Sequence, residues 1–211
     1  IIDEVGGVAS NLAVGIQLLG QPTQVVSVVG QDFLGTEVLW RLTEYGIQTS
    51  YIRTDWERSP RTVILVAPSG ERQLLCDFGD ASTYRYPDEV LREALEQAGQ
   101  WVYTSTHDWV RYAAHTAHNM GKFVATDVHD VVDVDDYHRD FYLAADLIFV
   151  SMARLRPTLV DYARHLHEGF GVKTVVGMDG ARGSWLVDAA TGDAQHFPVD
   201  RIAHVVDTVG A

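Results

Sequence analysis

The chain has 211 residues, of which 46% are hydrophobic, and a formal net charge of -13. This length and composition predict a soluble globular protein with one sizeable core. The acidic balance argues against broad nucleic-acid binding, which needs clustered Lys and Arg side chains. No apolar run approaches the roughly 20 residues of a membrane span, so we expect no membrane partner. The single cysteine, Cys76, excludes a disulfide framework and favours a cytoplasmic location.

Helical and extended patterns alternate along the chain. Apolar residues at helical spacing predict helices at 11–20 and 34–46, and a β-branched run between them predicts a strand at 23–30. Two extended runs around a Pro-Ser-Gly turn predict a hairpin within 61–79. Further on, helices are predicted at 87–98, 109–120, 137–145 and 157–169, and strands at 101–105, 122–128, 146–151 and 173–178.

Strands that alternate with helices of this length form βαβ crossovers. We therefore predict an α/β fold: a doubly wound, mostly parallel sheet with helices on both faces, from which the hairpin is an outgrowth. Sheets of this kind bind ligands beyond the carboxyl ends of their strands. Candidate site residues are therefore expected where the predicted strands end.

The segment "GGVASNLAVGIQLLG" places two glycines shortly before an asparagine at a predicted helix start. Gly6 and Gly7 allow a close backbone approach or a positive φ, and Asn11 offers a donor and an acceptor to a hydroxyl group. An ordinary glycine turn with Asn11 as the helix N-cap explains the same residues. This segment alone leaves both interpretations open.

Together with the spacing to Gly20 and Gly30, this segment resembles the first signature of the ribokinase, or PfkB, family of carbohydrate and nucleoside kinases. "GQDFLG" and the hairpin segment "RTVILVAPSGERQLLCDFGDAS" are similar to its G-x-D-x-x-G stretch and its lid strands. The closing "VVDTVGA" is similar to D-T-x-G-A-G-D, two residues short. The resemblance implies one incomplete ribokinase-like domain over 1–211, truncated at both ends, with a small β-lid around 51–82.

The resemblance implies ATP-dependent phosphorylation of a hydroxyl group on a sugar or nucleoside, with Mg²⁺ and, in some relatives, a monovalent cation. Backbone amides at Gly210 and Ala211 would form an anion hole, shaped by Asp207 and Thr208. The catalytic Asp would follow Ala211 and deprotonate the acceptor. Edge strands of the lid expose unpaired backbone groups, so a homodimer through the lid is expected by analogy.

The resemblance also implies which residues bind the two substrates. Gly6, Gly7, Asn11 and His107 would contact the acceptor, where His107 replaces an acid found in some sugar kinases. A histidine at the surface or at a strand end is the alternative for His107. The nucleotide phosphates would be bound by Ser151, Arg154, Gly180, Arg182 and Gly183.

Two departures from the family pattern fall on the nucleotide side. Ser151–Arg154 stands where the family shows N-x-x-E, and Met178 replaces a common Thr. An arginine cannot ligate Mg²⁺, but it fits phosphate bidentately. The departures allow altered ATP binding, another phosphoryl donor, or a catalytically silent protein that binds a sugar or nucleotide as a sensor or regulator.

Other sites are less well supported by the sequence. The run "TDVHDVVDVDD" gathers acidic residues and His129 after a predicted strand, which favours a solvated loop over a metal site. "GMDGARG" lacks G-x-G-x-x-G and precedes a strand-like segment, so it does not predict a Rossmann dinucleotide site. The chain has no G-x-x-x-x-G-K-[ST] motif, which excludes a P-loop kinase.

Overall fold

The structure, a computed structural model, describes residues 5–67, 72–79 and 83–199. The chain divides into two compact units, the first ending at Ala94 and the second beginning at Leu95. Each unit combines helices with a parallel β-ladder, and this confirms the predicted α/β class. Within the described part of the chain, no helix combines the length and the hydrophobicity needed to cross a bilayer.

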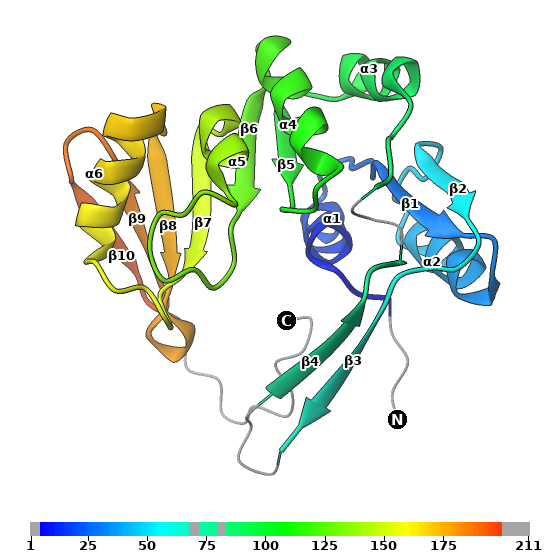
Figure 1. Ribbon diagram of the computed structural model, residues 1–211, viewed down its shortest axis with the longest axis horizontal. Helices are drawn as coiled ribbons and strands as arrows, with labels where there is room; N and C mark the ends of the chain where they lie inside the picture. The colour runs from blue at the N-terminus through cyan, green and yellow to red at the C-terminus, as the bar shows by residue number, and fades with distance from the viewer. Residues whose placement is uncertain (1–4, 68–71, 80–82, 200–211) are drawn as a thin grey trace. The chain divides into compact units, whose positions relative to one another are not determined.

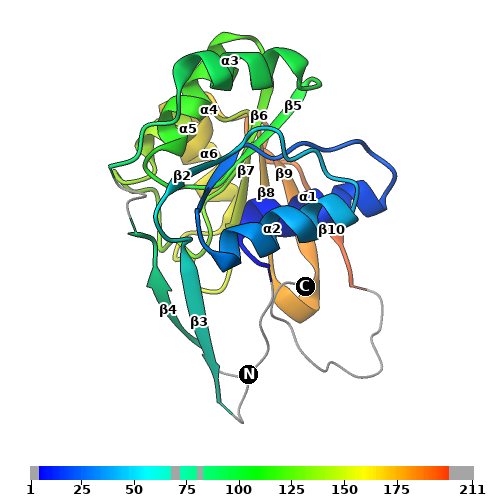
Figure 2. The ribbon, with the colours of Figure 1, turned by 90° about the vertical axis from the view of Figure 1, so that its right-hand side faces the viewer.

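The first unit contains two helices that lie side by side next to a short parallel ladder (Figure 2). Leu42 is almost completely buried among apolar residues of both helices and of the ladder. The elements of this unit are α1 (Val8–Leu18), β1 (Ser27–Gly30), α2 (Phe33–Glu44), β2 (Ile52–Trp56), β3 (Arg61–Val66), β4 (Arg72–Asp77) and most of α3 (Asp88–Gln97).

The strands of the first unit differ in extent from the sequence prediction. Of the strand predicted at 23–30, only β1 joins a ladder, and Gln24 makes an isolated bridge to Gln48. β2 falls inside the range 51–82 expected for the lid, but it pairs in parallel with β1. The hairpin itself is the antiparallel pair of β3 and β4, which forms a separate two-stranded sheet.

A hydrogen-bond network explains the G-x-D-x-x-G spacing. The Asp32 carboxylate accepts the N–H of Gly35 at 2.8 Å, which caps the N-terminus of α2. It also accepts the hydroxyl of Ser59 at 2.6 Å and the Ser59 N–H at 3.0 Å. The Ser59 oxygen in turn accepts the Gly30 N–H at 2.9 Å. Because Ser59 is only 5% exposed, water cannot easily replace these bonds.

The two glycines of this segment are required by close backbone contacts. A Cβ atom on Gly30 would lie 2.3 Å from the Ser59 nitrogen, and one on Gly35 would lie 2.0 Å from the Gly30 carbonyl oxygen. Neither contact involves the end of a flexible side chain, so any larger residue would displace backbone. The segment therefore joins α2 to the connection between β2 and β3.

Ten elements make up the described core of the second unit, and its six strands form one sheet (Figure 1). The strand order is β10-β9-β8-β7-β6-β5; β5 to β8 are parallel, and β9 and β10 are antiparallel. The elements are β5 (Trp101–Thr104), α4 (Val110–Asn119), β6 (Phe123–Asp127), α5 (Arg139–Ala144), β7 (Leu147–Ser151), α6 (Leu159–Phe170), β8 (Thr174–Met178), the 3₁₀-helix η2 (Gly180–Arg182), β9 (Ser184–Asp188) and β10 (Ala194–Phe197).

Helix α6 shows why the helical predictions in this unit were accurate. Its buried residues recur at the spacing of one helix face: Leu159, Tyr162, Ala163 and Leu166. The helix begins after Thr158, whose side chain accepts the Asp161 N–H at 3.1 Å, and ends at Gly171 in the left-handed conformation. The buried face packs on central strand residues of the sheet, which makes the strands a rigid support for the loops that follow them.

We expect Asp32→Asn to lower the free energy of unfolding by about 2 kcal/mol, because an amide cannot replace the carboxylate as acceptor in all of its charge-assisted bonds. The hydrogen bonds from Ser59 lower the pKa of Asp32 from 3.8 to about 2. A lowered carboxyl pKa stabilises the fold above pH 3.8 and loses this effect as the pH falls toward 2.

Urea denaturation between pH 7 and pH 3 measures this difference. The variant Glu44→Gln, on the exposed surface of the same helix, is the matched control and should change stability little. A wild-type advantage over Asp32→Asn that does not diminish at the acid end of the series would contradict the prediction.

Candidate functional site

The segment that contains Gly6, Gly7 and Asn11 forms the start of α1, but Asn11 is not its N-cap. Gly7 is the N-cap, with a φ of 97°, a left-handed conformation that favours glycine. Asn11 lies inside the first turn, where its N–H donates to the Gly7 carbonyl at 3.0 Å. The N-cap role considered for Asn11 is therefore wrong, and its exposed side-chain amide is available to a ligand. Around Gly6 there is open space where a Cβ atom would be.

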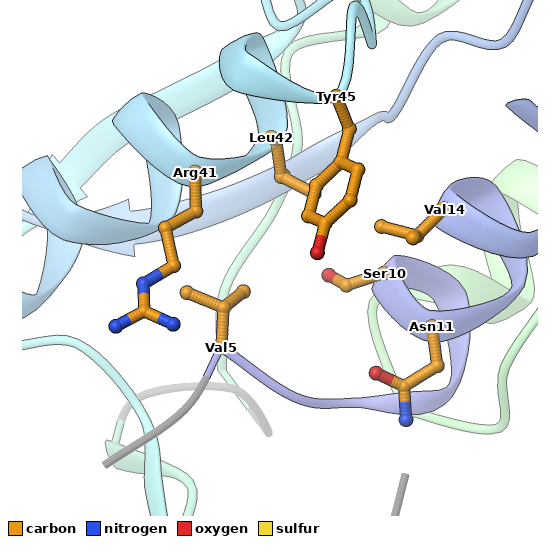
Figure 3. Close-up of a pocket in the computed structure, with 7 residues that line it drawn as sticks. All are labelled: Val5, Ser10, Asn11, Val14, Arg41, Leu42 and Tyr45. Atoms are coloured by element: carbon orange, nitrogen blue, oxygen red, sulfur yellow. The ribbon is translucent and has the colours of Figure 1, made fainter. Parts of the chain in front are cut away.

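Asn11 lines a pocket between α1 and α2 (Figure 3). The hydroxyl groups of Ser10 and Tyr45 point toward one another, whereas the Asn11 amide points away from the Tyr45 ring. Arg41 Nε donates to Glu37 Oε1 at 2.6 Å. The whole lining is Val5, Ser10, Asn11, Val14, Arg41, Leu42 and Tyr45. Of these residues, only Asn11 carried a site prediction from the sequence.

In the second unit, parallel pairing brings four strand ends to one edge of the sheet. His107 follows β5, Asp127 ends β6 and Ser151 ends β7. Gly180 follows β8 in the turn that leads to β9. The predicted residues His107, Ser151 and Gly180 therefore lie along the same edge, as expected for a parallel sheet that binds a ligand there.

His107 is half-buried at the end of β5. Burial lowers the pKa of its imidazole, and the charge of His129 lowers it further, against the opposing effect of Asp108. A lowered pKa keeps the ring neutral at pH 7, so that it presents one hydrogen-bond donor and one acceptor. His107 is thus a half-buried histidine shortly after a strand end, and its contact with an acceptor stays a prediction.

The residues after β6 form a tight turn. Asp127 Oδ1 accepts the His129 N–H at 2.8 Å, and Tyr103 donates its hydroxyl to Asp127 Oδ2 at 3.4 Å. His129 has a φ of 60° and is the only residue other than glycine with a positive φ in the described part of the chain. Its carbonyl accepts the Ser151 N–H at 2.8 Å, which ties this turn to the end of β7. The His129 side chain is exposed, in keeping with the solvated loop predicted from the sequence.

The end of β7 carries a cationic side chain. Arg154 is 63% exposed, and its Nη1 atom lies 3.7 Å from Asp130 Oδ2. This long, exposed ion pair is weak, so the guanidinium can exchange Asp130 for another anion. The Ser151 hydroxyl accepts the Ala153 N–H at 3.3 Å.

The turn after β8 holds three more of the predicted nucleotide residues, Gly180, Arg182 and Gly183. Arg182 Nε donates to Asp179 Oδ2 at 2.7 Å, and this contact lowers the pKa of Asp179. Gly180 and Gly183 both have positive φ values, 55° and 95°. Open space surrounds Gly180, but a Cβ atom on Gly183 would lie 2.1 Å from the Phe197 carbonyl oxygen. Only glycine at position 183 therefore lets the backbone at the end of β10 come this close to the turn.

The acidic side chains that follow β6 contact different partners. Asp130 faces Arg154, and Asp135 accepts from His138 Nδ1 at 2.9 Å. Across 5–67, 72–79 and 83–199, no group of three or more His, Cys, Asp or Glu side chains could hold a metal ion. The donors of Ser151–Arg154 do not fit a Mg²⁺ site, because a hard cation prefers carboxylate oxygens. Asp207, Thr208, Gly210 and Ala211 lie outside the described residues.

The carboxyl edge of the parallel strands carries imidazole, hydroxyl and guanidinium side chains. Open α/β sheets commonly bind ligands at this edge. Residues 3–211 match the family described as pfkB family carbohydrate kinase. The chain belongs to this family of enzymes, which transfer a phosphate group to a hydroxyl group of a sugar.

Three relatives illustrate the similarity. The chain is 29% identical over 208 residues to an acarbose 7(IV)-phosphotransferase from Actinoplanes sp., covering 98% of this chain and 69% of the relative. The solved structure of a microbiome-derived acarbose kinase has a TM-score of 0.84 and 26% identity, over 96% of this chain and 70% of that one. Arabidopsis thaliana ribokinase, solved with ribose and ATP, shares the fold with a TM-score of 0.79 at 19% identity, over 96% and 69% of the chains.

The contrast between the two glycines of the β8–β9 turn is testable. Gly183→Ala should lower stability by about 2 kcal/mol or more, because the methyl group meets backbone and the φ is strained. Gly180→Ala should cost about 1 kcal/mol, from the positive φ alone. Thermal unfolding of the two variants checks the difference. Equal losses for both variants would show that β10 does not approach Gly183 in this way.

Proposed function

We propose that this protein phosphorylates a hydroxyl group of acarbose or a related sugar, with ATP as the donor. The observation that carries the proposal is the match to the carbohydrate kinase family over 3–211, combined with two relatives that are named for acarbose. Those relatives favour a saccharide acceptor over a nucleoside. The neutral imidazole of His107 supports an uncharged, hydroxyl-bearing acceptor.

On the acceptor side, we assign contacts with sugar hydroxyls to Gly6, Gly7, Asn11 and His107. The left-handed Gly7 turn exposes backbone at the start of α1, and the Asn11 amide is exposed beside it. An amide side chain can donate to one hydroxyl and accept from another. These features support orientation of the acceptor, which is the main requirement for phosphoryl transfer.

On the donor side, we assign the phosphates of ATP to Ser151, Arg154, Gly180, Arg182 and Gly183. The guanidinium groups of Arg154 and Arg182 can neutralise phosphate charge, and both are exposed. Mg²⁺ accompanies ATP in this family, but we assign no step to a metal ion held by the described residues. The use of ATP predicts a cytoplasmic location, which the single free cysteine Cys76 also favours.

The chemical step is assigned to the closing segment of the sequence. Backbone amides at Gly210 and Ala211, shaped by Asp207 and Thr208, would stabilise the transferring phosphoryl group. An Asp after Ala211 would take the proton from the acceptor hydroxyl. These assignments stay predictions of the family resemblance.

An ADP-release assay on the product of the complete gene tests the function. We expect turnover with acarbose or another saccharide in a panel of pentoses, hexoses, oligosaccharides and nucleosides. Arg154→Gln should raise the KM for ATP about tenfold and leave the KM for the sugar unchanged, since one charge-assisted phosphate contact is lost. ADP release no higher than background with every acceptor would overturn the kinase assignment and favour a sensor or regulator.

We also propose a homodimer through the β3–β4 hairpin. Apolar side chains are exposed on both faces of this two-stranded sheet, and Val63 and Leu75 are cross-strand partners, 52% and 52% exposed. Surfaces of this kind commonly mark contacts between subunits.

The double variant Val63→Lys/Leu75→Lys should convert a dimer to a monomer in light scattering, because two lysines would oppose each other across the interface. Thr62→Lys, at a polar exposed position of the same strand, is the control and should leave the dimer intact. A wild-type protein that is monomeric at micromolar concentration rules out this assembly.

A further inference from the structure

The backbone of His129 has a conformation that glycine would adopt more easily than histidine. Its φ of 60° lies in the left-handed region, which residues with a Cβ atom disfavour because this atom crowds the following carbonyl oxygen. Glycine adopts this conformation without the penalty. The His129 side chain is exposed, so burial of the imidazole does not offset the strain. Such a position points to a functional role for the side chain.

The strain is maintained from both sides of the residue. The His129 N–H donates to Asp127 Oδ1 at 2.8 Å, and its carbonyl accepts the Ser151 N–H at 2.8 Å. These two bonds attach the turn to the ends of β6 and β7. The imidazole is therefore presented from a rigid support, as an accurate binding contact requires.

A second imidazole, that of His107, follows the neighbouring strand. β5 and β6 are parallel neighbours in which Thr104 and Thr126 are partners, and His107 and His129 each follow their partner by three residues. The charge of His129 contributes to the lowered pKa of His107, after the larger effect of burial. An imidazole in its neutral form can bind hydroxyl groups as a donor and as an acceptor.

Acidic and basic side chains are mixed along this edge of the sheet. Asp108 pairs with Arg111, and Asp130 faces Arg154. Asp127 accepts N–H and O–H donors and has no cationic partner among the described residues, so the side chains nearest to the ends of β5 and β6 do not gather positive charge for a phosphate. This surrounding is compatible with an uncharged hydroxyl group.

We propose that His129, together with His107, binds neighbouring hydroxyl groups of the sugar acceptor, and that His129 is a specificity-determining residue. This inference rests on the proposed sugar kinase function and adds to it a residue that contacts the acceptor. It also gives the reason for a strained residue where glycine would fit the backbone better.

The variant His129→Gly separates the side chain from the backbone. Glycine relieves the strain, so the melting temperature should stay equal or rise by about 2 to 4 °C. The KM for the sugar should rise about tenfold, the size expected for one lost hydrogen bond, while the KM for ATP stays unchanged. A purely structural role would not improve stability and weaken sugar binding in the same variant.

Two further variants sharpen the result. Asparagine tolerates the left-handed conformation and keeps a donor and an acceptor, so His129→Asn should restore part of the sugar affinity that His129→Gly loses. His165→Ala removes an exposed histidine from α6 and should leave the KM for the sugar and for ATP at the wild-type values. An unchanged sugar KM in His129→Gly, or a rise confined to ATP, overturns the inference while the kinase function stands.

A binding measurement tests the inference even without turnover. Saturating acarbose should shift the imidazole ¹⁵N resonances of His107 and His129 in the wild-type protein, and the His129→Gly variant assigns the second signal. Shifts of both signals support the histidine pair whether or not ADP is released. If both signals stay in place while acarbose is phosphorylated, only the histidine pair is refuted.

Discussion

Parallel hydrogen bonding between β5, β6, β7 and β8 is the constraint on which the described site depends. Strands that run in the same direction end at the same edge, so segments separated by many residues meet there. The helices that connect these strands bury their apolar faces on the sheet and prevent the strands from shifting in register. Without this register, His107 and His129 would not leave the sheet at corresponding positions of neighbouring strands.

The same edge carries side chains of both charges. His107, Asp127 and His129 lie at the ends of β5 and β6, whereas Arg154 and Arg182 follow β7 and β8 and face Asp130 and Asp179. The pairing of Arg154 with Asp130 is long and exposed, so it is weak and leaves the guanidinium able to exchange partners.

Two turns differ in how well their residue types suit the backbone conformation. At Gly30, Asp32 and Gly35, each residue type suits its backbone and its hydrogen bonds, so local preference and tertiary packing agree. At His129 they disagree, since the backbone favours glycine and the chain carries an imidazole. Positions that break a local rule are expected at functional sites, and the agreement elsewhere makes this exception informative.

The sequence by itself determined the α/β class, the helices and parallel strands from 87 to 178, and the hairpin, because periodicity and turn residues are local properties. Its motifs, which resemble those of the PfkB family, also identified the family. Only the tertiary structure decided that β2 pairs with β1, that Gly183 makes room for the end of β10, and that His107 and His129 follow paired residues of neighbouring strands. These features depend on contacts between residues distant in sequence, which no local pattern records.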